Sequence, residues 1–245
     1  MILFNLNKDN IKLIAMFTML LNHLATIYME PGTIIYELFI DIGYFTAITM
    51  CYFLVEGYTF TSSKKKYCTR LLFFAIISEF PYYLALNKVI GNMFFTLFLC
   101  FLIIWIEDNK KIKKHYRIAC LFIIMIISCL CDWGLLAPTF TLLFIWAKDS
   151  INKRKCAFLL SAALFGSMNF IAGMEEYETL WNVIRSIGSI SGIILSALFI
   201  LYLYNPCKKL ESLHQIIAKS ATLHQINMFN PVTLHHKIAK SATLH

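Results

Sequence analysis

Eight apolar segments joined by short polar connections restrict this chain to one kind of fold. Only 15% of its 245 residues are charged and 59% are hydrophobic, whereas a soluble domain carries about 25% charged residues. Because a bilayer offers no water to backbone polar groups, spanning segments of this type are helical. We therefore predict an all-α fold, a polytopic transmembrane bundle of about eight helices. The expected helices cover residues 10–29, 34–58, 70–86, 93–106, 118–131, 135–147, 156–173 and 180–204.

The basic residues predict how the chain crosses the membrane. The net charge is +8, and all of the 22 Lys and Arg residues except Lys88 and Arg185 fall on one side if every segment crosses. The connections on the other side carry acids such as Glu30 and Asp132. The positive-inside rule places the basic side in the cytoplasm. We expect a multi-pass protein of the cytoplasmic membrane, surrounded by lipid, with both termini cytoplasmic and no nucleic-acid partner.

The chain divides into residues 1–204, the expected transmembrane domain, and residues 205–245, a polar tail. In the tail, residues 217–224 recur without change as residues 238–245. Two copies are too few for a repeat architecture, so we expect a weakly structured appendage. The spacing of the eight cysteines suggests neither a metal site nor a disulfide framework. The segment at 135–147 contains Pro138, and could be re-entrant or continuous with the segment before it.

Lys12 and His23 lie on one face of the first predicted helix, roughly 16 Å apart along its axis. A histidine inside a membrane helix is costly and marks a functional site by default. Its pKa near operating pH suits it as a general base for an acceptor amine or hydroxyl. Lys12 would meet the phosphates of a nucleotide-bearing acyl donor. The structural alternative makes Lys12 a snorkelling anchor and His23 a packing residue.

Acidic and amide side chains supply candidate partners for His23. Asp41 and Glu79 could orient the imidazole and stabilise its charged form, as the carboxylate of a catalytic triad does. Asn22 or Asn92 could donate a hydrogen bond to a developing oxyanion. For each carboxylate, an ion pair that fixes helix packing is the structural alternative.

Other polar residues are candidates for a substrate pocket. Asn92 and Thr96 lie one helical turn apart and could line such a pocket, although helix capping by Asn92 is the simpler account. Asp132 follows the fifth helix. Glu56 and Arg70 flank a short connection and could form an ion pair.

Five motifs in this order resemble the TraX family, and together they cover about residues 11–204. They are Lys12 to His23, Tyr52 to Gly57, Arg70 to Pro81, Asn92 to Thr96, and Asp132 to Gly134. The family pattern has Asp at the position of Asn22. The family is named for a protein that acetylates pilin, and it looks like a relative of a large membrane acyltransferase superfamily. That superfamily carries a basic residue and a histidine in its first helix, separated by ten residues, which Lys12 and His23 match.

The resemblance implies an integral membrane acyltransferase that uses acyl-coenzyme A, with acetyl-CoA as the expected donor. The acceptor would be an amine or hydroxyl of a pilin-like peptide or a surface glycan. The alternatives are a small proton-coupled transporter and a non-catalytic TraX-like membrane protein. The expected catalytic residues are His23, Asn22, Asp41 and Glu79. The expected donor-binding residues are Lys12, Lys64, Lys65, Lys66 and Arg70. The expected pocket residues are Glu56, Asn92, Thr96 and Asp132.

Overall fold

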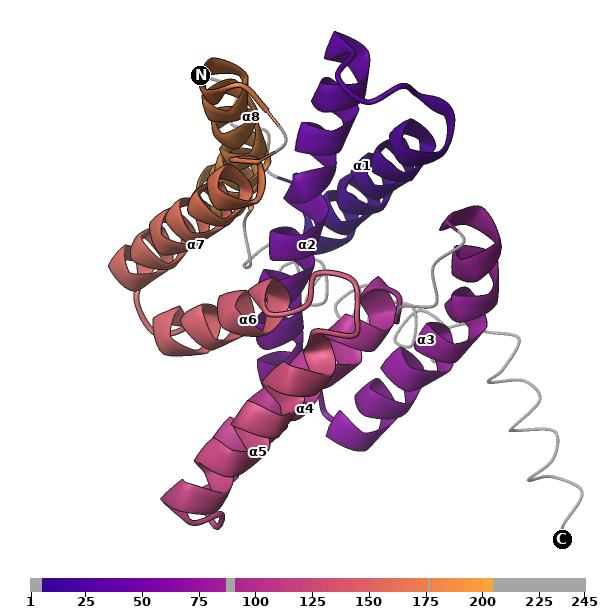
Figure 1. Ribbon diagram of the computed structural model, residues 1–245. Helices are drawn as coiled ribbons and strands as arrows, with labels where there is room; N and C mark the ends of the chain where they lie inside the picture. Colours follow the sequence, from indigo (N-terminus) through magenta and orange to yellow (C-terminus); the bar gives the residue numbers. More distant parts are fainter. Residues whose placement is uncertain (1–5, 87–90, 176, 205–245) are drawn as a thin grey trace, which may run out of the picture.

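The computed structural model describes residues 6–86, 91–175 and 177–204. Eight α-helices make up this part of the chain (Figure 1), which confirms the predicted all-α bundle. They are α1 (Lys8–Tyr28), α2 (Ile34–Phe60), α3 (Lys64–Leu86), α4 (Met93–Asp108), α5 (Lys114–Ser128), α6 (Leu136–Ala147), α7 (Ile151–Ala172) and α8 (Thr179–Leu198). A π-helix, η1 (Phe199–Leu203), continues α8. The predicted tail repeat and Lys88 lie outside the described residues.

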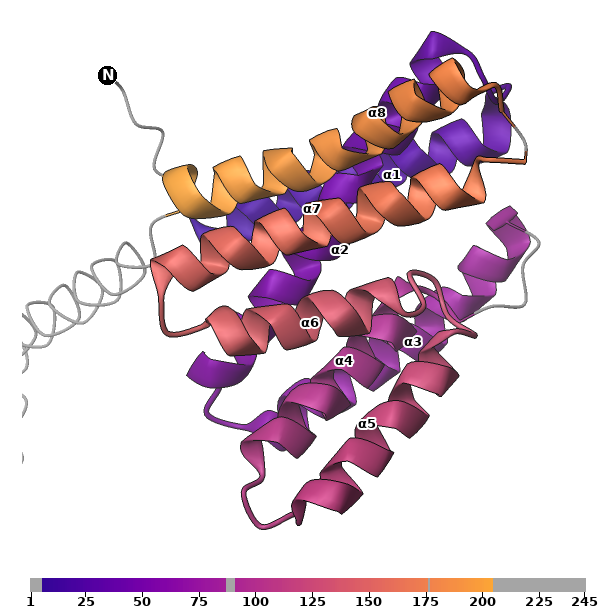
Figure 2. The ribbon, with the colours of Figure 1, turned by 60° about the vertical axis from the view of Figure 1, so that its left-hand side comes forward.

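Helix α2 lies at the centre of the bundle and contacts α1, α4, α6 and α8. Within its most apolar stretch of 18 residues, 67% of the residues are buried, compared with 11% for the corresponding stretch of α3. Figure 2 shows α7 and α8 side by side along one flank. Gly192 on α8 permits the close approach to α2, because a Cβ there would collide with the backbone of Asp41 and Phe45. Small residues at such crossings are typical of membrane helix packing.

Large apolar side chains cover the outside of the bundle. Phe80 on α3 is 71% exposed, and Phe122 on α5 is 66% exposed. Five helices, namely α1, α2, α3, α7 and α8 with η1, are long and apolar enough to cross a membrane. An apolar outer surface of this extent is suited to lipid rather than to water. The described helices therefore form a multi-pass membrane bundle.

One end of the bundle is held together by basic residues and is named here the basic end. Lys8 on α1 pairs with Glu56 at the end of α2 (2.7 Å), and Lys64 on α3 pairs with Asp108 at the end of α4 (2.6 Å). The backbone N–H of Leu6 donates to the carbonyl of Leu203 (3.0 Å). The start of α1 and the end of η1 therefore lie together, as an even number of crossings requires.

Helix α6 is too short to cross a bilayer by itself. Its 12 residues span about 18 Å, compared with a hydrocarbon thickness of about 30 Å. Pro138 lies in its first turn, where proline is tolerated. The segment is thus a separate short helix rather than a continuation of α5. The residues between α5 and α6 are non-helical, and such backbone is stable within a membrane where it is buried in protein or lines a polar cavity.

Long basic side chains account for the main differences in helix bounds. Helices α3, α5 and α7 begin at Lys64, Lys114 and Ile151, several residues before the predicted starts. Lys and Arg are good helix formers, and their aliphatic stems can pack on apolar surface while the charge reaches water. The clusters at residues 64–66 and 153–155 therefore belong to the starts of α3 and α7, whereas Lys110, Lys111 and Lys113 remain in the connection before α5.

Candidate functional site

A polar cavity of about 390 Å³ lies at the end of the bundle opposite the basic end. Helices α1, α2, α3, α4, α6, α7 and α8 contribute to its wall, together with the connection between α5 and α6. Its polar lining includes Asn22, His23, Tyr44, Asp132 and Arg185. Ionisable groups inside a membrane bundle are expected to face a wet cavity or one another. The cavity is therefore the candidate site.

His23 and Asn22 enter the cavity from the second half of α1. The His23 ring contacts the Tyr82 ring of α3 edge-on, with centroids 6.1 Å apart. The Asn22 amide donates to the carbonyl of Ile40 (3.2 Å) and packs over Gly43 of α2. Asn22 thus fixes α1 against α2 at the level of His23. Two residues of the predicted catalytic set lie in one cavity.

Asp132 enters the same cavity from the connection before α6. Its backbone N–H donates to the carbonyl of Gly91 (2.7 Å), and its own carbonyl accepts a hydrogen bond from the Thr96 hydroxyl. These bonds tie the α5–α6 connection to the start of α4. Asp132 was predicted as a pocket residue, and the structure places it in the wall that contains His23.

Trp133 has an unusual backbone conformation at this site. Its φ is +61°, a left-handed value that is uncommon for a bulky residue and costs of order 1–3 kcal/mol. The indole stacks on Phe165 at 5.2 Å and meets Tyr44 edge-on at 5.8 Å. All three rings line the cavity. The strained turn therefore directs an aromatic wall, as well as Asp132, into the site.

Glu79 and Asn92 do not line this cavity but support the connection that carries Asp132. The Glu79 carboxylate accepts hydrogen bonds from the backbone N–H of Asn92 (3.1 Å) and from its side-chain amide (2.6 Å). The Asn92 side chain also caps α4, as the simpler alternative anticipated. Glu79 lies in the wall of a second, mainly apolar cavity of about 370 Å³ between α3, α4 and α5. Thr96 is likewise absent from the cavity lining, and its hydroxyl supports the connection by donating to the backbone carbonyl of Asp132.

Asp41 also lies away from His23. Its carboxylate faces Gly188 on α8 and is absent from the lining of the polar cavity. Neither carboxylate that was predicted to orient His23 shares a cavity wall with it, whereas Asp132 does. Asp132 was predicted as a pocket residue but not as the partner of His23.

The predicted donor-binding residues lie at the basic end, apart from the cavity. The Lys12 amine lies 6.0 Å from the centroid of the Phe53 ring, and Lys65, Lys66 and Arg70 are exposed. The suggested Glu56–Arg70 pair is wrong. Both Glu56 oxygens are engaged instead, one by Lys8 (2.7 Å) and the other by the Tyr204 hydroxyl (2.8 Å).

A closed helix seam separates Lys12 from His23. The hydroxyl oxygens of Thr18 on α1 and Thr46 on α2 are 2.9 Å apart, and both lie within hydrogen-bond distance of the Ala15 carbonyl (2.9 and 2.6 Å). These three residues are buried. Thr46 also lines the cavity. The cavity that contains His23 is not lined by Lys12, and this buried seam lies between the levels of the two residues along α1.

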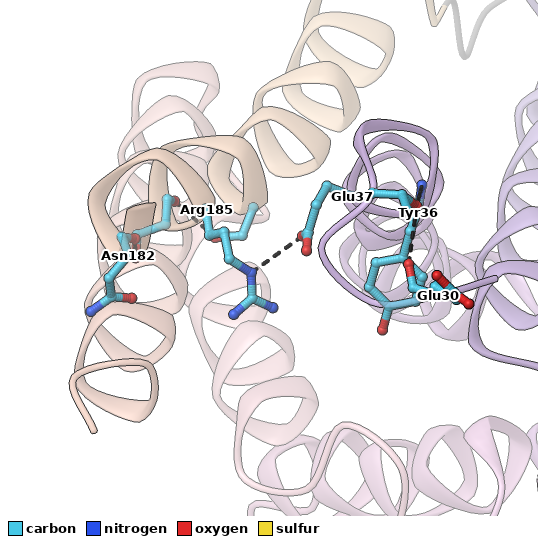
Figure 3. Close-up of polar contacts among 8 residues, drawn as sticks. Glu30, Tyr36, Glu37, Asn182 and Arg185 are labelled. Atoms are coloured by element: carbon cyan, nitrogen blue, oxygen red, sulfur yellow. Dashed lines mark hydrogen bonds and ion pairs between the residues drawn. The ribbon is translucent and has the colours of Figure 1, made fainter. Parts of the chain in front are cut away.

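Arg185 is the charged residue of the cavity wall that was not predicted as a site residue. Its Nε atom donates to Glu37 at 3.3 Å, between α8 and α2 (Figure 3). The signal was present in the sequence, because Arg185 is one of two basic residues on the acidic side. Among residues 6–86, 91–175 and 177–204, no three His, Cys, Asp or Glu side chains cluster as metal ligands.

These features define a multi-pass helical membrane protein with a polar cavity that contains His and Asp at one end. The chain belongs to the TraX family, because the model of that family, described as TraX protein, matches residues 7–208. It is similar to a protein of Dichelobacter nodosus described as "Probable fimbrial assembly protein FimC, serogroup H1". The two are 29% identical over 202 residues, which cover 77% of this chain and 80% of the relative. No solved structure matches the chain.

Proposed function

We propose that this protein is a membrane acyltransferase that moves an acetyl group from acetyl-CoA to an amine or hydroxyl acceptor. The observation that supports this most is the shared cavity of His23 and Asp132, which lies at the opposite end from the Lys and Arg clusters. An anionic donor would bind at the basic end, and the acceptor would bind in the cavity. The activity that the TraX resemblance implies agrees with this arrangement.

The proposed roles follow from the positions in the cavity. His23 accepts the proton of the acceptor amine or hydroxyl as that group attacks the thioester carbonyl. A C–N or C–O bond forms, the C–S bond breaks, and the imidazolium returns the proton to the coenzyme A thiolate. Asp132 takes the orienting role that was predicted for Asp41 and Glu79. Asn22 supplies a donor for the oxyanion.

The proposed donor side is the basic end, on the cytoplasmic face of the cytoplasmic membrane. Lys12, Lys64 to Lys66 and Arg70 would attract the phosphates of the donor there. For the acetyl group to reach His23, the α1–α2 seam at Thr18 and Thr46 must open. The acceptor, a pilin-like peptide or a surface glycan, would come from the other face. In this proposal both termini are cytoplasmic.

Labelling with acetyl-CoA tests the proposal. Membranes that contain the protein and receive labelled acetyl-CoA should transfer label, and His23→Ala should lower the rate by about 10²- to 10⁴-fold, the usual contribution of a general base. His115→Ala provides a matched control, because His115 lies in the first turn of α5 at the basic end and should leave transfer unchanged. Undiminished labelling by His23→Ala would remove His23 from the mechanism. A wild-type protein that neither transfers label nor binds coenzyme A would favour the non-catalytic alternative.

A further inference from the structure

Arg185 is held rigidly at the cavity wall by two neighbours. Its Nε donates to the Glu37 carboxylate (3.3 Å), and its guanidinium carbon lies 4.1 Å from the centroid of the Tyr177 ring. The side chain retains 28% of its accessible surface. An arginine fixed on one edge by a carboxylate and on one face by an aromatic ring loses little entropy when its other edge binds a ligand.

The remaining edge of Arg185 is available to a ligand. A guanidinium carries five N–H donors, and the bond to Glu37 uses only the one on Nε. In Figure 3 the two terminal nitrogens point away from Glu37. Within the described part of the chain, no hydrogen bond from these nitrogens is present. Two parallel N–H groups of this kind match the oxygens of a carboxylate or a phosphate.

The charges around the cavity favour a ligand that carries both a negative and a positive group. Glu37 balances the charge of Arg185, and the Asp41 carboxylate lies nearby against Gly188. At another part of the wall, Asp132 accompanies His23. Helices α1 and α8 both pack on α2, so His23 and Arg185 flank the cavity-lining face of α2. A small anion alone would be repelled by the three carboxylates, whereas an anion with an attached amine would not be.

We infer that Arg185 is the anion-binding pole of the cavity, so that the acceptor carries a carboxylate or a phosphate near its nucleophilic group. The ammonium or hydroxyl of such a ligand would then lie towards Asp132 and His23. That the ligand is an acyl acceptor rests on the proposed function, but the anion site itself does not. The inference adds no chemical step to the transfer.

Ligand binding to the purified full-length protein in detergent tests the inference without an acyl donor. The probes are O-phosphoethanolamine, glycine and ethanolamine, compared at constant ionic strength by the shift in melting temperature. Phosphoethanolamine or glycine should stabilise the protein and ethanolamine should not. The stronger of the two anionic probes identifies phosphate or carboxylate as the preferred group. Equal shifts from all three probes would overturn the inference.

Variants of the ion pair sharpen the test. Arg185→Gln should weaken binding of the anionic probe at least about tenfold, as expected for loss of charge-assisted hydrogen bonds, and Arg185→Lys should restore it only in part. Because Arg185→Gln leaves Glu37 without its cation, the double variant Glu37→Gln/Arg185→Gln is measured as well. Glu37→Gln alone should strengthen anion binding by removing a competing carboxylate. If Arg185 served only to join α2 and α8, Glu37→Gln would lower the melting temperature and leave the response to the probes unchanged.

The two proposals can fail independently. An Arg185-dependent shift with phosphoethanolamine, together with unaltered acetyl transfer in His23→Ala, would leave the anion site in place and contradict the enzymatic mechanism. Loss of transfer in His23→Ala, with no Arg185-dependent response to either anionic probe, would support the enzymatic mechanism and contradict the anion site.

Discussion

Asn92 joins α3 to the start of α4 beside the site. Its amide donates to the Ala75 carbonyl (2.8 Å) and to Glu79 (2.6 Å), and its side-chain oxygen accepts from the first N–H groups of α4. Asn92→Ala would leave these buried groups unpaired, and we expect it to lower the free energy of unfolding by about 2–4 kcal/mol. Thermal denaturation in detergent measures this loss. Asn7→Ala removes an exposed cap with one such bond and should cost about 0.5–1 kcal/mol; equal losses would contradict the supporting role of Asn92.

Individual residues also show which parts of the site a sequence can predict. Helical periodicity predicts that Lys12 and His23 share one helix face, but the structure brings only His23, with its neighbour Asn22, into the cavity. The position of Asp132 depends on a pairing between Gly91 and Cys131, which are 40 positions apart. No local pattern encodes such a pairing, so the sequence could not show which of Asp41, Glu79 and Asp132 shares a cavity with His23. Only the packed bundle distinguishes them.

At the level of helices, the proposed acetyl transfer requires the α1–α2 seam at Thr18 and Thr46 to open. Thr18→Cys with Thr46→Cys, in a background without the other cysteines, places two thiols where hydroxyls lie 2.9 Å apart. If acetyl transfer requires this seam to open, oxidation to a disulfide should abolish transfer and reduction should restore it. Gel mobility after labelling of free thiols reports the extent of cross-linking.

A second hydroxyl pair provides the matched control for that experiment. Thr49 on α2 and Ser196 on α8 lie 2.7 Å apart and are equally buried. Cross-linking Thr49→Cys to Ser196→Cys joins a different pair of helices and should leave transfer unchanged. If both cross-links abolish transfer, the requirement is for general mobility of the bundle, and if neither does, the donor reaches His23 by another route.

At the scale of the whole molecule, apolar segment count and charge pattern were sufficient to predict eight helices. Their lengths were less predictable, because the start of a helix such as α7 depends on whether its basic side chains continue the helical turn. The cavity was beyond prediction from sequence, since its wall combines residues from seven helices and one connection. Arg185 illustrates the limit. Its unusual position on the acidic side was visible, but its partner Glu37 is 148 positions away.

Orientation in the membrane gives the last prediction. Basic side chains of three helix connections lie at the end where Leu6 meets Leu203, and the positive-inside rule places this end in the cytoplasm. In a cysteine-free background, an impermeant maleimide applied to intact cells should label Glu30→Cys, on the exposed turn between α1 and α2. Lys111→Cys, on the exposed turn between α4 and α5, should be labelled only after the membrane is opened. The reverse pattern would mean that the protein has the opposite orientation, with the cavity on the side of the donor. Labelling of both positions in intact cells would contradict an antiparallel bundle whose connections alternate across the membrane.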